Sequence, residues 1–207
     1  MPPKVQVSKD TILNTAMELV FREGPDVITY QALAKELGRS TQTIAWKFGS
    51  IGNLLDELAE YILDYFNTQI IQGWNNGKNP IADFTFTEEV YLKLAFEQPN
   101  LVQFVRSHST RSAADGGVGF VFDQEKSKDL RQYIVKAAGI NDNQAADYIK
   151  NIVIYAHGLV SMAVDRTINI AFEDASAMIR QASITYLVGY GVPEDMAVSF
   201  FGENNDI

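Results

Sequence analysis

The residues best suited to do chemistry lie between Arg39 and Lys47, where amides, hydroxyls and a cation recur at helical spacing. Gln42 and Thr43 lie near the start of this stretch and Lys47 comes one turn later, so a helix here shows all three on its outer face. Amides and hydroxyls can pair with base edges in the major groove of DNA, and a cation can pair with a phosphate. Trp46 either stacks on sugar and backbone or is half-buried against the first helix. The stretch therefore predicts a surface that contacts duplex DNA.

Two short helices joined by a tight turn are expected to position these residues. Apolar side chains recur at helical spacing in residues 29–37, and Gly38 comes next, where a glycine ends a helix because it adopts the left-handed conformation cheaply. Ser40 then offers an N-cap oxygen to a second helix, whose Ile44 and Phe48 face inward. This order is that of the helix-turn-helix. An ordinary helical hairpin has the same pattern, and these twenty residues do not separate the two.

The flanking segments favour the DNA-binding interpretation. Residues 12–24 have the pattern of an amphipathic helix with a glycine stop, and a long apolar pattern begins after residue 51. With these flanks, the chain resembles the TetR family of transcriptional repressors over about its first fifty-five residues. Beyond them, only helix order and length are similar. The matching residues are Ile12, Ala16, Phe21, Gly24, Thr29, Leu33, Ala34, Leu37, Gly38, Ser40, Thr43, Ile44, Phe48, Ser50 and Leu54.

Two positions depart from the family pattern. Ala45 stands where the family usually has Tyr, and Ile51 stands where it usually has Lys, so two common phosphate contacts are missing. Lys47 fills the place of the basic residue that the family usually has near the end of this helix. The departures concern affinity and docking on DNA and leave the expected fold unchanged.

The resemblance implies an all-α fold with two domains. Residues 1–50 are expected to form a three-helix, helix-turn-helix DNA-binding domain, and residues 51–207 a larger helical domain for ligand binding and dimerisation. The candidate DNA-binding residues are Thr29, Tyr30, Arg39, Ser40, Thr41, Gln42, Thr43, Trp46 and Lys47.

The charge of the chain is unevenly distributed. The net charge is −9, yet residues 1–50 hold six Lys and Arg against five Asp and Glu, so the acidity lies outside the proposed DNA-binding part. There is no cysteine, which excludes disulfides and thiolate metal ligands. The first residues lack the apolar core of a signal peptide, and no apolar run approaches the ~20 residues of a membrane span. A soluble, cytoplasmic protein is expected.

The remaining chain predicts further helices and no strand. A long helix over 51–73 is expected to couple the DNA-binding part to the rest of the chain, and the Asn, Gly and Pro residues of 74–80 end it. Residues 110–119 have the composition of a loop, and the polar tail after Pro193 is expected to be loose. The other expected helices span residues 9–23, 81–98, 101–108, 122 or 123 to 138, 144–170 and 174–190.

Aromatic residues concentrate between Tyr61 and Tyr155, where they could wall an apolar site inside a helical bundle. Most of them are expected to be ordinary core. The candidate ligand-binding residues are Phe66, Trp74, Tyr91, Phe104, His108 and Tyr155. His157, in contrast, lies in an apolar helical stripe and is expected to be a packed core residue.

These patterns predict a homodimeric transcriptional regulator. It is expected to be a repressor that a small apolar or amphipathic ligand releases from a palindromic operator. In the family, the last two long helices form a four-helix bundle with the partner subunit. The alternative is a helical ligand-binding or interaction module without DNA binding. No catalytic residue, metal site or cofactor is predicted, because neither histidine has partners at the spacing that catalysis or metal ligation needs.

Overall fold

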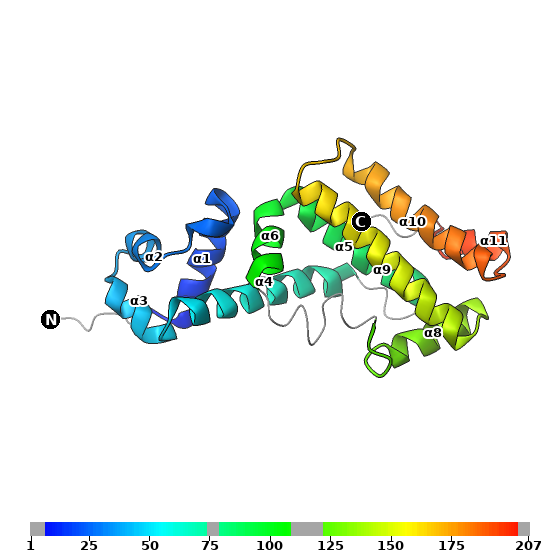
Figure 1. Ribbon diagram of the computed structural model, residues 1–207, viewed down its shortest axis with the longest axis horizontal. Helices are drawn as coiled ribbons and strands as arrows, with labels where there is room; N and C mark the ends of the chain where they lie inside the picture. The colour runs from blue at the N-terminus through cyan, green and yellow to red at the C-terminus, as the bar shows by residue number, and fades with distance from the viewer. Residues whose placement is uncertain (1–6, 74–78, 109–121, 203–207) are drawn as a thin grey trace. The chain divides into compact units, whose positions relative to one another are not determined.

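The computed structural model describes residues 7–73, 79–108 and 122–202, and within these ranges every regular element is a helix (Figure 1). The all-α prediction is confirmed. The expected loop at 110–119 lies outside the described residues, as does most of the expected break at 74–80. The elements are α1 (Lys9–Glu23), η1 (Pro25–Val27), α2 (Tyr30–Leu37), α3 (Thr41–Phe48), α4 (Ile51–Gly73), α5 (Pro80–Glu97), α6 (Pro99–His108), α8 (Lys128–Ala138), α9 (Asp142–Val164), α10 (Phe172–Gly189) and α11 (Glu194–Ser199).

The described residues pack into two compact units. The first unit consists of the chain up to Tyr65 together with residues 98–108, and so contains α1, η1, α2, α3, α6 and most of α4. The second unit begins at Phe66 and contains the end of α4, then α5 and everything from α8 to α11. The single helix α4 thus contributes to both units. A domain boundary after residue 50 stays a prediction, since these units are defined by packing and not by role.

The first unit is built around α1. The Ser8 side chain caps this helix by accepting a hydrogen bond from the backbone N–H of Thr11 at 3.0 Å. Its inner stripe is buried, with Ile12, Ala16 and Val20 each 0% exposed. Helix α6 packs against α1 and η1. Burial of this stripe holds the short helices α2 and α3 in place, because helices of eight residues are not stable by themselves in water.

The second unit is built around α5, which packs against α8, α9 and α10. Because α5 has neighbours on several sides, even its polar residues are buried. Thr85 of α5 shares a hydroxyl hydrogen bond at 3.4 Å with Ser183 of α10, and the Tyr148 hydroxyl of α9 also bonds to Ser183. Burial raises the pKa of Tyr148 to about 12, so this phenol stays protonated and can donate. The three hydroxyls therefore satisfy one another inside the three-helix contact.

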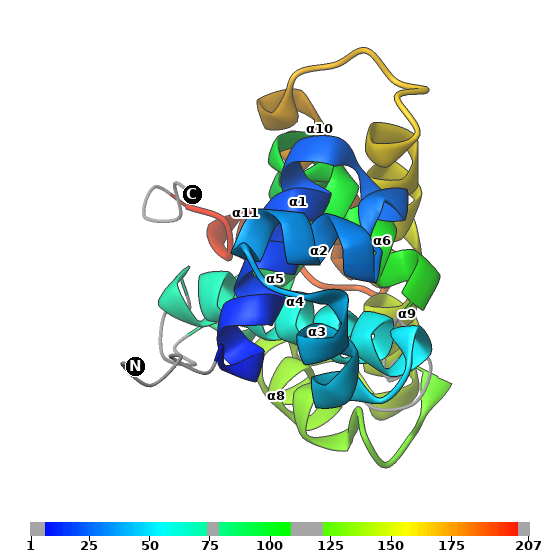
Figure 2. The same cartoon turned by 90° about the vertical axis from the view of Figure 1, so that its left-hand side faces the viewer.

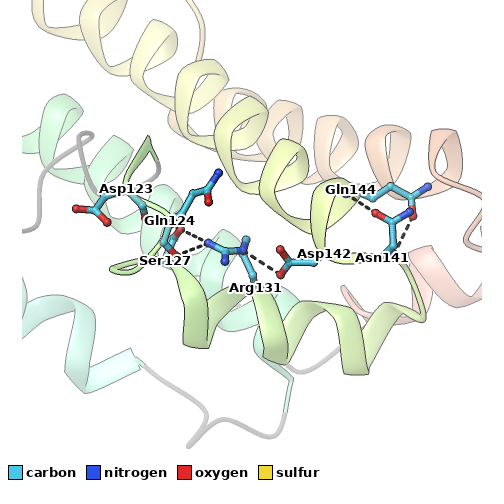
Figure 3. Close-up of polar contacts among 7 residues, drawn as sticks. All are labelled: Asp123, Gln124, Ser127, Arg131, Asn141, Asp142 and Gln144. Atoms are coloured by element: carbon cyan, nitrogen blue, oxygen red, sulfur yellow. Dashed lines mark hydrogen bonds and ion pairs between the residues drawn. The ribbon is translucent and has the colours of Figure 1, made fainter.

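A buried arginine fixes the corner between α8 and α9 (Figure 3). Arg131 donates from Nε to the Asp142 carboxylate at 3.0 Å, and from one terminal nitrogen to the Ser127 hydroxyl and the Gln124 carbonyl, both at 2.7 Å. Asn141 and its capping-box partner then begin α9, since each side chain bonds to the backbone N–H of the other residue. The network ties the turn before α8, helix α8 itself and the start of α9 into one structure.

Helix boundaries differ from expectation by more than two residues at three places. The helix expected from residue 122 or 123 begins only at Lys128, because the Asp123 side chain accepts hydrogen bonds from the N–H groups of Glu125 and Lys126 and so forms a turn. The helix expected to reach residue 170 ends at Val164, and Arg166 just beyond it has a left-handed φ of 54°.

The third difference is the C-terminal tail, for which the sequence predicts a loose segment. Its described part forms α11, with Pro193 at the N-cap and two acidic residues, Glu194 and Asp195, in the first turn. Ala197 is completely buried, so this short helix belongs to the packed unit. Helix α6, in turn, begins at Pro99 itself, since proline is accepted in the first turn of a helix.

Candidate functional site

Helix α3 presents the polar face that the sequence predicts. Figure 2 shows the two helices of the motif, α2 and α3, on the side toward the viewer. Ser40 caps the helix, accepting a hydrogen bond from the backbone N–H of Thr43 at 3.3 Å. Ile44 and Phe48 are 1% and 4% exposed, which fixes the rotation of the helix about its axis. Thr41, Gln42 and Thr43 are consequently exposed, and Lys47 is partly exposed. The amide, the hydroxyls and the ammonium group therefore lie on the outside of one short helix.

The exposure of Trp46 decides between the two positions considered for it. Its side chain is 79% exposed, so it is not half-buried against another helix of the described chain. An indole of this exposure, next to Gln42 and Lys47 on an otherwise polar helix, is a large apolar group with an N–H donor facing solvent. Such a side chain is suited to stack on sugar and backbone atoms of a docked nucleic acid.

The turn before α3 has the geometry expected of the motif. Gly38 adopts a left-handed conformation with φ of 60° and ends α2, and its N–H donates back to the Lys35 carbonyl at 3.4 Å. Arg39 comes next and lies on the surface. At the other end of α2, Thr29 is the N-cap and accepts from the N–H of Ala32 at 3.1 Å. Arg39 and Thr29 are thus held at the two ends of α2.

Tyr30 lies differently from the other candidates. Its ring is partly buried, and its hydroxyl is the only fully enclosed side-chain polar atom without a hydrogen-bond partner in the part of the chain that the structure describes. Enclosed hydroxyls without a partner are uncommon and destabilising. The Tyr30 hydroxyl therefore faces protein, and it reaches a DNA phosphate only if the side chain moves.

The cations of residues 7–65 fall into two groups, of which the first is paired with acids. Lys9 pairs with Glu57 at 2.7 Å and lies 4.9 Å from the centre of the Phe48 ring. Arg22 bridges Glu23 and Glu36, and these hydrogen bonds raise its pKa. The charges of Lys9 and Arg22 are therefore largely neutralised by neighbouring carboxylates.

The second group consists of Lys35, Arg39 and Lys47, on α2, the turn and α3. No ion pair joins any of them to another residue within the described ranges. The unneutralised positive charge of these helices is thus concentrated on the two helices of the motif and the turn between them.

The candidate ligand-binding residues do not form one cluster. Phe66 and Tyr91 meet edge to face in the second unit at 6.2 Å between ring centres, and Tyr91 also contacts His157 at 5.5 Å. Phe104 and His108 belong to the first unit, where their rings stack at 4.4 Å and the His108 Nδ1 lies 3.1 Å from the Phe104 carbonyl oxygen.

Two further candidates complete the set. Tyr155 is partly buried on α9, whereas Trp74 lies outside the described residues. His157, expected to be a packed core residue, is partly buried against Tyr91. Among the candidates, ring contacts therefore join Phe66 to Tyr91 and Phe104 to His108, in two separate units.

Three acidic residues of α5 are buried, and the sequence alone does not predict this burial. Asp83, Glu88 and Glu89 are 8%, 7% and 2% exposed. An amphipathic helix normally turns its charges outward, so nothing in their immediate neighbours marks them as buried. The available signal is the apolar pattern around the whole of α5, which indicates a helix with neighbours on several sides. Burial raises the pKa of Glu88 to about 7.

Metal-binding clusters and membrane-spanning helices are both absent from the described residues. Three or more His, Asp or Glu side chains do not gather anywhere in these ranges in a way that could hold a metal ion. None of the described helices combines the length and the apolar composition that crossing a bilayer requires.

Comparison with known proteins agrees with the geometry of the first unit. Residues 12–58, from α1 into α4, match the model of the family described as bacterial regulatory proteins, tetR family. No curated protein matches the sequence. Among solved structures, the chain is similar to a TetR transcriptional regulator from Rhodococcus sp. RHA1, with 19% identity, a TM-score of 0.48, and coverage of 86% of this chain and 95% of that one. The segment 12–58, which contains the helix-turn-helix, is therefore similar to the N-terminal DNA-binding part described by the model of the tetR family of bacterial regulatory proteins.

Proposed function

We propose that this protein is a homodimeric repressor that binds a palindromic operator and that a small apolar or amphipathic ligand releases it from DNA. The observation that carries the DNA-binding part of the proposal is the outer face of α3. Gln42 and Thr43 are exposed there, while the buried Ile44 and Phe48 anchor the opposite face. In this proposal, Gln42 and Thr43 contact base edges, and Lys47 and Arg39 contact phosphates.

The remaining candidates support the same docking. Ser40 and Thr41 lie at the N-terminal end of α3, and Thr29 with Tyr30 lies at that of α2. Backbone N–H groups at the start of a helix favour an anion, so both ends are suited to lie beside a phosphate. Trp46 is proposed to pack on the sugar–phosphate backbone, where it would partly compensate for the missing Tyr and Lys of the family pattern.

A dimer is proposed because one helix-turn-helix reads too few bases for specific binding, and two-fold partners read half-sites about 34–36 Å apart. The outward sides of α9 and α10 carry exposed apolar residues that suit this role, namely Ile154, Met162, Met178 and Val188, which are 55%, 39%, 41% and 39% exposed. Apolar side chains exposed in this way on two helices that pack against each other are typical of an interface between subunits.

The direct test is selection of duplexes from a random-sequence DNA pool by the purified full-length protein, followed by fluorescence anisotropy at a stated salt concentration. We expect a palindromic consensus. The double variant Gln42→Ala and Thr43→Ala should weaken binding by ~1–3 kcal/mol for each base pairing that it removes. Gln132→Ala, which changes an exposed glutamine of α8, is the matched control.

The second candidate function is a helical ligand-binding module that does not bind DNA. The specific observation in its favour is the sequence at two positions, Ala45 and Ile51, where the family's usual phosphate contacts are missing. Selection that yields no consensus, together with equal DNA affinity of the wild type and the double variant, would replace the first proposal by this one.

A further inference from the structure

The buried acids of α5 differ in one respect, which is whether a partner neutralises them. Glu89 is held by Arg180 of α10 through two hydrogen bonds of 2.6 and 3.1 Å. Asp83 also has an interaction partner. Glu88, although only 7% exposed, forms no hydrogen bond or ion pair with any residue that the structure describes. One carboxyl group in the core of the second unit is therefore left without a partner among these residues.

Aromatic residues of α5 lie one helical turn to either side of Glu88. One helical turn before it, Phe84 packs on Tyr148 of α9 at 5.9 Å between ring centres. One turn after it, Tyr91 contacts Phe66 and His157 at 6.2 and 5.5 Å. Residues three and four positions apart share a face of a helix. Phe84 and Tyr91 therefore flank the carboxyl group along the same side of α5.

The polar groups close to this position are already committed to one another. Thr85, Tyr148 and Ser183 share their hydrogen bonds, and the Arg180 guanidinium is bound to Glu89. His157, the other titratable group contributed by α9 here, packs on Tyr91. Nothing in this set supplies Glu88 with a positive charge.

Glu88 is therefore a buried acid that lies between aromatic rings and has no partner among the described residues. Such a group is costly for folding, because burying a charge without a partner is unfavourable. A positively charged ligand that paired with the carboxylate would offset this cost.

We propose that Glu88 is the anionic contact of the effector site and that the effector is an organic cation, a protonated amine or quaternary ammonium carried on an apolar body. The cation pairs with the Glu88 carboxylate, and the rings of Phe84 and Tyr91 add attraction through their faces. The apolar body packs among the aromatic residues of the same core. This inference rests on the proposed function, since it names the chemical class of the ligand that releases DNA.

Binding of a cation also moves a proton. The neutral carboxyl group of the free protein releases its proton to the buffer, and the resulting carboxylate pairs with the bound cation. The attraction within this pair is stronger in the protein core than in water because the local dielectric constant is lower. Ligand affinity should therefore rise as pH increases from 6 to 8 for a quaternary ammonium, whose own charge does not change.

The test measures ligand binding without DNA, by isothermal titration calorimetry on the full chain. The probes share one body and differ in charge: 4-phenylbutylamine, (4-phenylbutyl)trimethylammonium, 4-phenylbutanol and 4-phenylbutyrate. We expect both cations to bind the wild type at least ten times more tightly than the alcohol, and the carboxylate to bind most weakly. Titration in phosphate and in Tris buffer should show proton release with the quaternary probe.

Glu88→Gln should abolish the preference for cations while keeping affinity for the alcohol. Glu97→Gln, which makes the same change at an exposed position of α5, should behave as the wild type. Glu88→Met is a second variant that removes the carboxyl group without adding a polar one, and circular dichroism checks that each variant is folded. The proposal is overturned if the cations do not bind the wild type up to millimolar concentration, or if their preference survives in Glu88→Gln.

A separate measurement of DNA binding distinguishes this inference from the proposed function. Anisotropy on a selected duplex is repeated with each probe at saturation. If the cations bind through Glu88 and DNA affinity does not change, Glu88 is part of a cation-binding site that does not control DNA binding. If neutral compounds release DNA equally from the wild type and from Glu88→Gln, the proposed regulation by a ligand is supported. The proposal that the ligand is a cation held by Glu88 is then wrong.

Discussion

Glu88 is the residue at which stability and the proposed recognition of a ligand oppose each other. Its pKa is about 7 in the folded chain because burial disfavours the charged form, against an ordinary value of 4.5 in the unfolded chain. A raised carboxyl pKa means that the folded state binds the extra proton, so this group reduces stability as pH rises from about 4.5 to about 7. Below that window the group has no effect, and above it the full penalty is present.

Replacing Glu88 should therefore stabilise the protein at high pH and leave it little changed at low pH. The free energy of unfolding of Glu88→Gln, minus that of the wild type, should increase by about 3 kcal/mol between pH 5 and pH 8. Urea denaturation at several pH values measures this difference, and other titrating groups cancel in it because both proteins contain them. Glu97→Gln is the control; a difference that stays constant with pH would show that the Glu88 carboxyl group is not buried.

Tyr30 offers a second test at a single atom. Since its hydroxyl is enclosed without a partner, Tyr30→Phe removes an unsatisfied polar group and should raise the free energy of unfolding by about 1 kcal/mol. DNA affinity should remain within a factor of two if the hydroxyl stays inside. Thermal denaturation and anisotropy measure the two effects. A loss of stability would mean that the hydroxyl has a partner, and a loss of affinity alone would mean that it moves out to contact DNA.

At the scale of elements, the sequence is informative wherever a residue type has one strong local effect. Ser8, Thr29 and Ser40 are residues typical of N-caps, and each accepts the backbone hydrogen bond expected of it. Gly38 marks the end of α2 because its left-handed conformation is costly for other residues. The motif and the outward face of α3 are therefore predictable, since both depend on contacts within a few residues.

The elements that the sequence does not predict depend on contacts distant in sequence or on competing local bonds. The segment from Asp123 to Ser127 has a helical composition, but the Asp123 side chain takes the N–H groups of the next residues into a turn. Burial of Glu88 and Glu89 results from three helices that surround α5, and no local pattern encodes that arrangement. For the same reason composition alone groups the aromatic candidates into one set, although Phe104 and His108 pack in a different unit from Phe66 and Tyr91.

The corner between α8 and α9 should be sensitive to Arg131. Arg131→Ala leaves the Ser127 hydroxyl and the Gln124 carbonyl without their donor and should lower the free energy of unfolding by about 2 kcal/mol. Arg131→Lys should recover only part of that stability, because an ammonium group cannot reach three acceptors in the planar geometry of guanidinium. Chemical denaturation measures both. Lys128→Ala, on the exposed side of α8, is the control, and an equal effect of the control would contradict a specific role of Arg131.

The whole molecule combines an acidic body with a DNA-binding part of nearly balanced charge. With a net charge of −9, DNA association has to depend on the few unpaired cations of α2, the turn and α3. Few phosphate contacts per subunit imply that specific binding would need both subunits of the proposed dimer. In this proposal the state of assembly matters more for DNA affinity than in a strongly basic protein.

Formation of the proposed dimer should be prevented when a charge is placed on the exposed apolar side of α9. Ile154→Glu should convert the protein to monomers at micromolar concentration, because a carboxylate buried between subunits without a partner is unfavourable. Sedimentation velocity measures the change, and DNA affinity should fall at least tenfold with it. Gln132→Glu adds the same charge on α8 and should leave the dimer intact. A dimeric Ile154→Glu would place the subunit interface elsewhere.

The exposure of Trp46 gives the protein a built-in optical reporter. The chain has only two tryptophans, so the variant Trp74→Phe leaves Trp46 as the single indole fluorophore. In water, an indole that is 79% exposed emits at long wavelength, and contact with sugar and bases would shift its emission to shorter wavelength and quench it. Docking and release could then be followed in real time, without any dye, from the light emitted by the same helix that is proposed to enter the groove.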